Sequence, residues 1–150
     1  MSEPILEQIA QYIKGKLDEL VDAGEASEVS RPLRAGVPTS PRDKSLVLIQ
    51  LDPTEDESPM GRKSWVQPFE IEAFVVPDDS STTPADTLIN RLRSQIEKKV
   101  RENPNCGGLA TDLRVLAPEL FTLVDGGIDG VTVNFTVFYR TLEDDPYTQG

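Results

Sequence analysis

The sequence contains no histidine and only one cysteine, Cys106. The absence of histidine excludes Ser–His and Cys–His nucleophile pairs, and it excludes every histidine-ligated metal site. A single cysteine forms neither an intrachain disulfide nor a thiolate zinc site, and such cysteine usage suits a reducing compartment. Because Cys106 follows a predicted helix and has no second cysteine to resolve it, we interpret it as a free, inert thiol.

Long apolar runs are also missing, since no run exceeds about four residues against the ~20 that a membrane helix needs. The opening MSEPILEQ has no basic region before an apolar stretch, so we expect no signal peptide and a cytoplasmic product. The net charge is −11, from 26 acidic and 15 basic residues. Binding to phosphates needs concentrated Lys and Arg, so this charge argues against nucleic acid and against an anionic membrane as partners.

What the sequence does contain is regular hydrophobic periodicity, which predicts two amphipathic helices. The first covers residues 4–24. The second begins after Thr83 as N-cap, with Pro84 in its first position, and runs to about residue 102. In both helices the apolar positions recur every four residues. These positions are Ile5, Ile9, Ile13 and Leu17 in the first helix and Leu88, Leu92, Ile96 and Val100 in the second.

Four segments read as strands. Residues 45–52 and 65–76 form a predicted long hairpin around an acidic loop, and residues 109–124 form a strand bent or interrupted at Pro118. The last strand, residues 131–141, is the antiparallel partner of that interrupted strand. A further short strand near residues 29–34 would make five.

The order of these elements predicts one α+β domain over residues 1–150, a mostly antiparallel sheet of four to five strands with two main helices packed on one face. We expect residues 25–44 and 53–64 to be irregular loops and residues 142–150 to be a flexible tail.

The last strand has the cleanest alternation in the chain. One face is apolar and is predicted to lie on the core, whereas the other face is polar except for Phe138. The core face consists of Val131, Val133, Phe135, Val137 and Tyr139, and the other face of Thr132, Asn134, Thr136, Phe138 and Arg140. This second face contacts either solvent or another molecule.

Acidic residues in two places invite a chemical interpretation. Asp52, Glu55, Asp56 and Glu57 lack the spacing of a calcium-binding loop, so we interpret them as a solvated loop. Glu70 and Glu72 share one strand face, but an acid–base pair needs a pocket and a perturbed pKa, and nothing near them in the sequence indicates either. We therefore predict no catalytic residue, no metal site, no cofactor and no enzymatic activity.

A cluster of bases on the second helix stands out in this acidic chain. Its members are Arg91, Arg93, Lys98, Lys99 and Arg101. Two interpretations are open: a solvated helix back, or a contact between unlike surfaces of two copies. In the second, the basic helix of one copy meets the acidic hairpin loop or the LEDDP tail of the next, and such head-to-tail contacts close into rings.

The layout resembles the tail terminator family of long-tailed bacteriophages. The resemblance rests on the helix ILEQIAQYIKGKLDEL, the hairpin from SLVLIQLD to FEIEAFVV, the helix TPADTLINRLRSQIEKKV and the ending DGVTVNFTVFYRTLEDDPY. The ending FTVFYRTLEDDPY, an aromatic-rich strand followed by Tyr-Arg and an acidic stretch with Asp-Pro, is similar to that of many such proteins. The resemblance covers most of the chain but includes no catalytic signature.

What the resemblance implies is a structural virion protein, assembled in the host cytoplasm. Such proteins form a ring, typically hexameric, that caps the tail tube, ends its polymerisation and joins the head. The implied partners are further copies, the tail tube protein and a neck or head-completion protein, with DNA only passing through the ring. A head-completion or neck connector protein and an acidic monomeric module for a basic partner are the alternatives. The candidate interface residues are Arg91, Arg93, Lys98, Lys99, Arg101, Phe138, Arg140, Glu143, Asp144 and Asp145.

Overall fold

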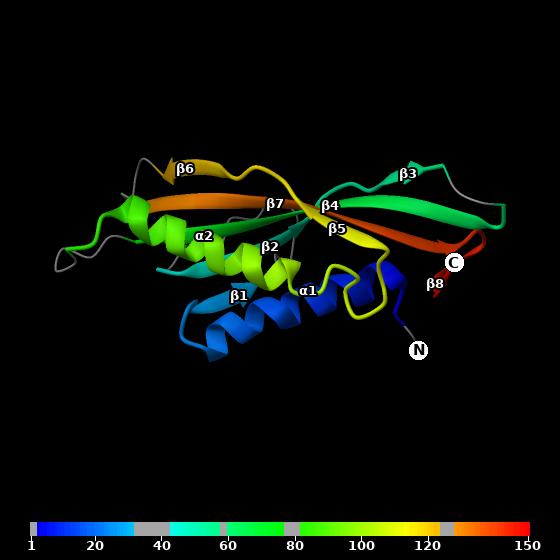
Figure 1. Ribbon diagram of the computed structural model, residues 1–150, viewed down its shortest axis with the longest axis horizontal. Coiled ribbons are helices and arrows are strands. Elements are labelled where there is room, and N and C mark those ends of the chain that lie inside the picture. The colour runs from blue at the N-terminus through cyan, green and yellow to red at the C-terminus, as the bar shows by residue number, and fades with distance from the viewer. Residues whose placement is uncertain (1–2, 32–42, 58–59, 77–81, 124–127) are drawn as a thin grey trace.

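The computed structural model describes residues 3–31, 43–57, 60–76, 82–123 and 128–150. They form an α+β fold in which two helices contact a curled, mixed but mostly antiparallel main sheet of five strands, shaped as a half-barrel. Both helices lie on one side of the sheet (Figure 1). The predicted fold class is confirmed.

Helix α1 spans Ile5–Asp22 and helix α2 spans Ala85–Arg101. The predicted stripe of α1 is buried, and that of α2 is buried except for Leu88, which is only partly buried, whereas its neighbour Ile89 is buried. Helix α2 begins one residue later than expected. Pro84 is its N-cap, with an extended ψ of 145°, and no side chain caps the helix there. The prediction that Thr83 caps α2 was therefore wrong: the backbone carbonyl of Pro84 accepts the hydrogen bonds from the N–H groups of Thr87 and Leu88 instead.

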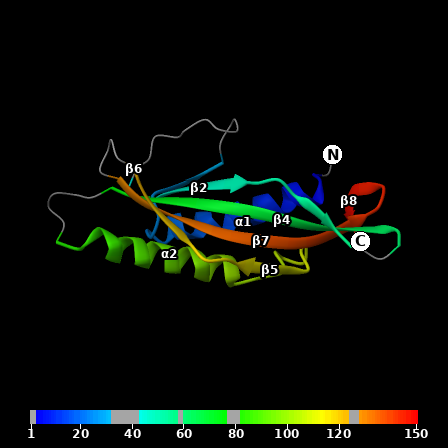
Figure 2. The ribbon, with the colours of Figure 1, turned by 90° about the horizontal axis from the view of Figure 1, so that it is seen from above.

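The main sheet has the strand order β1-β2-β4-β7-β5. These strands are β1 (Glu28–Ser30), β2 (Ser45–Gln50), β4 (Arg62–Val75), β7 (Ile128–Leu142) and β5 (Asp112–Val115). Strands β1 and β2 pair in parallel, and the other neighbours are antiparallel. Strands β4 and β7 pair along the whole length of β4, and this long ribbon is the axis of the molecule (Figure 2).

Three short strands pair with the ends of this ribbon: β3 (Thr54–Asp56) with β4, and β6 (Glu119–Leu123) and β8 (Asp145–Gln149) with β7. The gap between β5 and β6 confirms the interruption at Pro118. The other two strands correct our expectations, because β3 lies inside the predicted 53–64 loop and β8 inside the predicted flexible tail. Both segments pair with residues at or next to the predicted strand ends, β3 with residues 64–66 of β4 and β8 with residues 141–142 of β7, where the strand edges offer backbone partners.

The segment 25–44 is only partly irregular in the described residues, since it includes β1; residues 32–42 lie outside them. Arg31, just after β1, holds this region to α1 through two hydrogen bonds to Glu7, of 2.8 and 3.0 Å. The parallel β1–β2 pairing makes the sheet mixed, and it places β2 in the sheet interior, where its first four residues are buried.

The predicted core face of β7 is confirmed, since all five of its residues are buried. The rings of Phe69 on β4 and Phe135 on β7 stack with centroids 5.3 Å apart at the centre of the core. The helices cover this face, whereas the other face of β4 and β7 carries no helix among the described residues (Figure 1). The end of the ribbon that pairs with β3 extends beyond the helices, whereas β8 lies beside α1 (Figure 1).

Candidate subunit interface

Two of the five bases of α2 form ion pairs with acidic residues of the same chain. The Nε of Arg93 lies 3.9 Å from a carboxylate oxygen of Glu97, and the Nζ of Lys99 lies 3.7 Å from Glu19 on α1 and 3.4 Å from Glu102. Arg93 and Lys99 are half-buried. These two bases therefore stabilise the helix layer of their own chain and have less charge to offer a neighbour.

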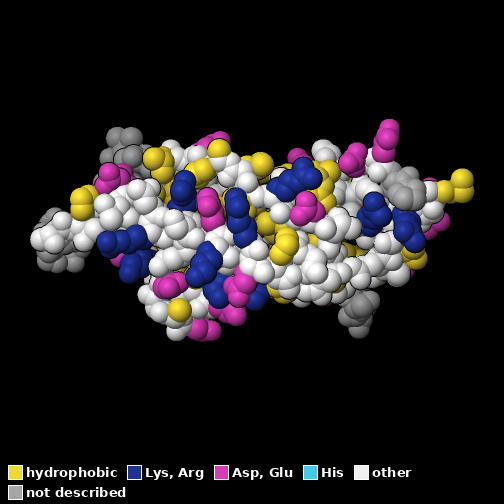
Figure 3. Space-filling view, in the orientation of Figure 1, with side chains coloured by type: hydrophobic (Ala, Val, Ile, Leu, Met, Phe, Trp, Pro, Cys, Tyr) yellow, Lys and Arg dark blue, Asp and Glu magenta, His cyan; other side chains and the backbone are white. Residues whose placement is uncertain are grey.

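The other three bases of α2, Arg91, Lys98 and Arg101, are exposed and form no ion pair among the described residues. Their spacings of seven and three residues place them along one side of the helix. We call these three residues the basic stripe. Basic side chains gather over α2 in the space-filling view (Figure 3). Of the five bases predicted for this face, these three are the ones without an ion pair among the described residues.

Two acidic segments far apart in the sequence meet at the extended end of the β4–β7 ribbon. The backbone N–H of Glu143 donates to the carbonyl of Gly61, 2.9 Å away, so the β7–β8 turn lies against the β3–β4 turn. We call the exposed acids of β3 and of these turns the acidic tip. They are Glu55 and Asp56 of β3 and Glu57, Glu143 and Asp144 of the turns, and they outnumber the two bases at the same end, Arg62 and Lys63. The sequence analysis named the hairpin loop and the tail as alternative contacts of the basic helix. In the fold the two lie next to each other and form one surface.

Asp145 differs from its acidic neighbours because its carboxylate is used within the chain. It accepts hydrogen bonds from the Thr148 hydroxyl and from the backbone N–H of Tyr147, the latter 3.0 Å long. The hydrogen bond from Thr148, followed by that from Tyr147, lowers the pKa of Asp145. We interpret Asp145 as the residue that shapes the β8 turn rather than as part of the acidic tip.

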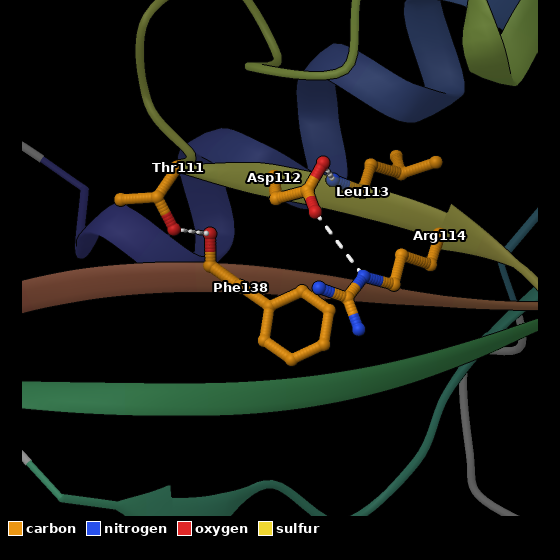
Figure 4. Close-up of polar contacts among 5 residues, drawn as sticks. All are labelled: Thr111, Asp112, Leu113, Arg114 and Phe138. Atoms are coloured by element: carbon orange, nitrogen blue, oxygen red, sulfur yellow. Dashed lines mark hydrogen bonds and ion pairs between the residues drawn. The ribbon is translucent and has the colours of Figure 1, made fainter.

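On the outer face of β7, Phe138 is half-buried and Arg140 is exposed. The guanidinium of Arg114, from β5, lies over the Phe138 ring at 5.0 Å and is held by Asp112 at 3.2 Å (Figure 4). The hydroxyl of Thr111 donates to the Phe138 carbonyl over 2.9 Å. Arg114 was not predicted as an interface residue. The signal available in the sequence was its position on the strand that pairs with β7. Arg140 forms no ion pair among the described residues.

The carboxylates of Glu70 and Glu72 do share the outer face of β4, as the spacing predicted. Burial, and secondarily repulsion from Glu70, raises the pKa of Glu72. Our expectation of an unperturbed pair therefore needs correction, because the sequence did not show how far the sheet would bury Glu72. The cavity described below is lined by neither residue.

Cys106 is buried, and burial raises the pKa of its thiol to about 11. Since the thiolate is the nucleophile and the metal ligand, this environment favours the inert form. Within the described ranges, no three Cys, Asp or Glu side chains come together as a metal site would need. No described helix has the length and apolar character of a membrane span.

One small cavity, of about 200 Å³, lies where α2 passes the ends of α1 and β4. Its apolar wall comes from Val75, Leu88 and Leu92, and the basic-stripe residue Arg91 stands at its edge. The volume is below the ~300–1,000 Å³ of typical small-molecule sites. The cavity is thus of a size for a single side chain.

No protein-family model matches this sequence, and no curated protein matches it significantly.

Proposed function

We propose that this protein is a structural ring component of a long-tailed bacteriophage, of the tail terminator type. The observation that carries the proposal is the presence of two unlike, oppositely charged surfaces, the basic stripe on α2 and the acidic tip at the far end of the β4–β7 ribbon. The resemblance of the element order and of the ending to tail terminators supplies the biological context.

Unlike surfaces on one chain favour head-to-tail association, because the tip of each copy is free to meet α2 of the next. Such heterologous contacts close into a ring when the rotation between copies is a simple fraction of a turn. Charge complementarity sets the orientation and speeds the encounter of the copies. The stacked core beneath gives each copy the rigidity of a wedge.

In this proposal one face of the ring binds the last layer of the tail tube and the opposite face lacks tube-like docking features, so tube growth ends there and a neck or head-completion protein binds instead. The excess of acidic residues, with a net charge of −11, lets DNA pass through the lumen without adhering. The protein would act without catalysis, cofactor or metal.

Negative-stain imaging and mass photometry of the purified protein, alone and with tail tube protein, test the proposal. We expect rings with a central hole, and tubes of limited length that carry a ring at one end. A strict monomer that neither caps tubes nor limits their length would contradict it. Rings that bind only a head-side neck complex would instead identify a neck connector, the alternative that shares the ring architecture.

A further inference from the structure

The most exposed large apolar side chain of the described residues is Met60, with a relative accessibility of 101%. It lies in the turn before β4, next to Gly61, whose φ of +82° gives the tight turn that holds Met60 outward. The N–H of Glu143 donates to the carbonyl of the neighbouring Gly61, so an acid of the tip lies close to Met60, and the base Arg62 follows two residues along the chain. A flexible, polarizable methionine held away from its own core is a side chain suited to filling a partner's cavity.

The cavity beside α2 offers such a place. Its apolar wall of Val75, Leu88 and Leu92 matches a thioether side chain, and two cations, Lys44 and Arg91, stand at its edge. Glu25 and Asp43 also line it, and the carboxylate of Asp43 accepts a hydrogen bond of 3.1 Å from the N–H of Val76.

The cavity of one chain is out of reach of its own Met60. Met60 precedes the first residue of β4, whereas Val75, in the cavity wall, is the last residue of the same strand. The fourteen-residue strand separates the two by about 40 Å. Strand β4 is paired with β7 along its full length, which excludes folding back. Met60 can therefore enter such a cavity only in another copy of the chain.

We propose that Met60 of one copy inserts into the cavity beside α2 of the next copy. This inference rests on the proposed ring and names the contact that joins its subunits. Insertion brings the acids on either side of Met60, Glu57 and Glu143 among them, to the cations Arg91 and Lys44 of the neighbour. The apolar contact excludes water from these charge pairs, which strengthens them.

Disulfide trapping tests the contact directly, because the only native thiol, that of Cys106, is buried. The full-length double variant Met60→Cys with Gln95→Cys, which places the second thiol at the cavity wall, should form intermolecular disulfides and a ladder of linked oligomers under mild oxidation. The matched control is Met60→Cys with Gln11→Cys, an exposed position on α1. Equal cross-linking of the two variants, or none in either, would overturn the inference.

Substitution at the tip gives an independent measurement. Met60→Asp should weaken self-association by roughly 10- to 100-fold, the value of one apolar side chain, whereas Met60→Leu should retain it. Because Met60 is fully exposed, neither variant should change the unfolding midpoint. Wild-type rings that Met60→Asp leaves intact would reject this contact and keep the proposed ring. Absence of any association, trapped or free, in wild-type and cysteine variants, both alone and with tail tube protein, together with no effect on tube length, would reject both.

Discussion

The two helices of this protein have the same packing role but opposite electrostatic character. Both lie on the same face of the sheet and both bury an apolar stripe. Helix α1 carries four acids and two lysines, whereas α2 carries two acids and five bases. Both lysines of α1 pair with acids of α1, Lys14 with Asp18 and Lys16 with Glu19, at 3.1 and 3.4 Å. Three bases of α2 have no such partner in the part of the chain that the structure describes.

This difference teaches that burial and charge serve separate purposes in the helix layer. The core requires only that each helix present an apolar stripe, and it leaves the outward residues free to differ. On the outward face of α1, both lysines form ion pairs with acids of the same helix. Helix α2 has an outward face on which three bases form no ion pair with any described residue, as the proposed interface requires.

The largest expected effects on stability come from the buried apolar stripe, which both helices have. Leu17→Ala on α1 and Ile96→Ala on α2 remove fully buried side chains, and each should lower the free energy of unfolding by about 2–5 kcal/mol. Urea denaturation followed by circular dichroism measures both. A loss below about 1 kcal/mol at either position would show that the corresponding helix is not part of the core.

Charge reversal should affect self-association when it is made on α2 but not when it is made on α1. The triple variant Arg91→Glu, Lys98→Glu and Arg101→Glu should weaken self-association by roughly 100-fold or more, because like charges then face the acidic tip of the next copy. The unfolding midpoint should change little. Sedimentation velocity over a concentration series measures association.

The matched control is on α1, where Lys14→Glu with Lys16→Glu breaks two surface pairs. It should change stability only slightly, because both lysines pair at the surface, and leave association unchanged. If the two variants impair association alike, the basic stripe has no special role and only net charge matters.

Alanine substitutions on the outer face of β7 should weaken association less than charge reversal on α2 does. Arg140→Ala should weaken association while stability stays within about 0.5 kcal/mol, since Arg140 is exposed. Phe138→Ala should cost about 1–2 kcal/mol, because it also removes the contact with Arg114. Arg114→Ala is the control that removes this contact alone. If the variants lose stability and association to the same extent, this face has no role in association and is simply exposed to solvent.

The smallest effects concern pH, with opposite signs at two glutamates. Hydrogen bonds from Arg31 lower the pKa of Glu7, so its contribution is complete above the unfolded-state value of ~4.3 and is lost as the pH falls through the folded-state pKa. Burial raises the pKa of Glu72, so the folded state loses stability as the pH rises from ~4.3 through the folded-state pKa.

Urea unfolding between pH 3 and pH 8 distinguishes the two. Glu7→Gln should lower stability at neutral pH, and Glu72→Gln should raise it, each by at most about 1 kcal/mol because both groups are partly solvated. Glu70→Gln, which removes the repulsion but not the burial of Glu72, should give a smaller gain than Glu72→Gln. A loss of stability in Glu72→Gln at neutral pH would contradict the burial argument.

Much of the fold followed from local patterns. The alternation from Val131 to Tyr139 identified every core residue of β7, because successive side chains of a strand point to opposite faces. The four-residue spacing identified the buried stripe of α1 and three of the four buried residues of α2, where Ile89 rather than Leu88 is buried. The short strands β3 and β8 did not follow, because three to five residues carry too little periodicity and their pairing depends on how far β4 and β7 extend.

The candidate interface was predicted only in part. The bases of α2 were visible in the sequence, and so was the i,i+4 spacing of Arg93 and Glu97. That Lys99 reaches Glu19 on α1, and that Arg114 covers Phe138, depends on which elements become neighbours. Met60 was not recognised, because an apolar residue in an acidic loop gives no signal until its exposure is known.

The sequence by itself determined the class of the fold, the two buried helix stripes, the two faces of β7 and the excess of acid, because these depend on spacing and composition along the chain. Only the tertiary structure decided which charges remain unpaired, that two distant acidic segments form one tip, and that a cavity lies a full strand length from Met60. These properties depend on which segments meet in space, and long-range pairing is not encoded in any single stretch of residues.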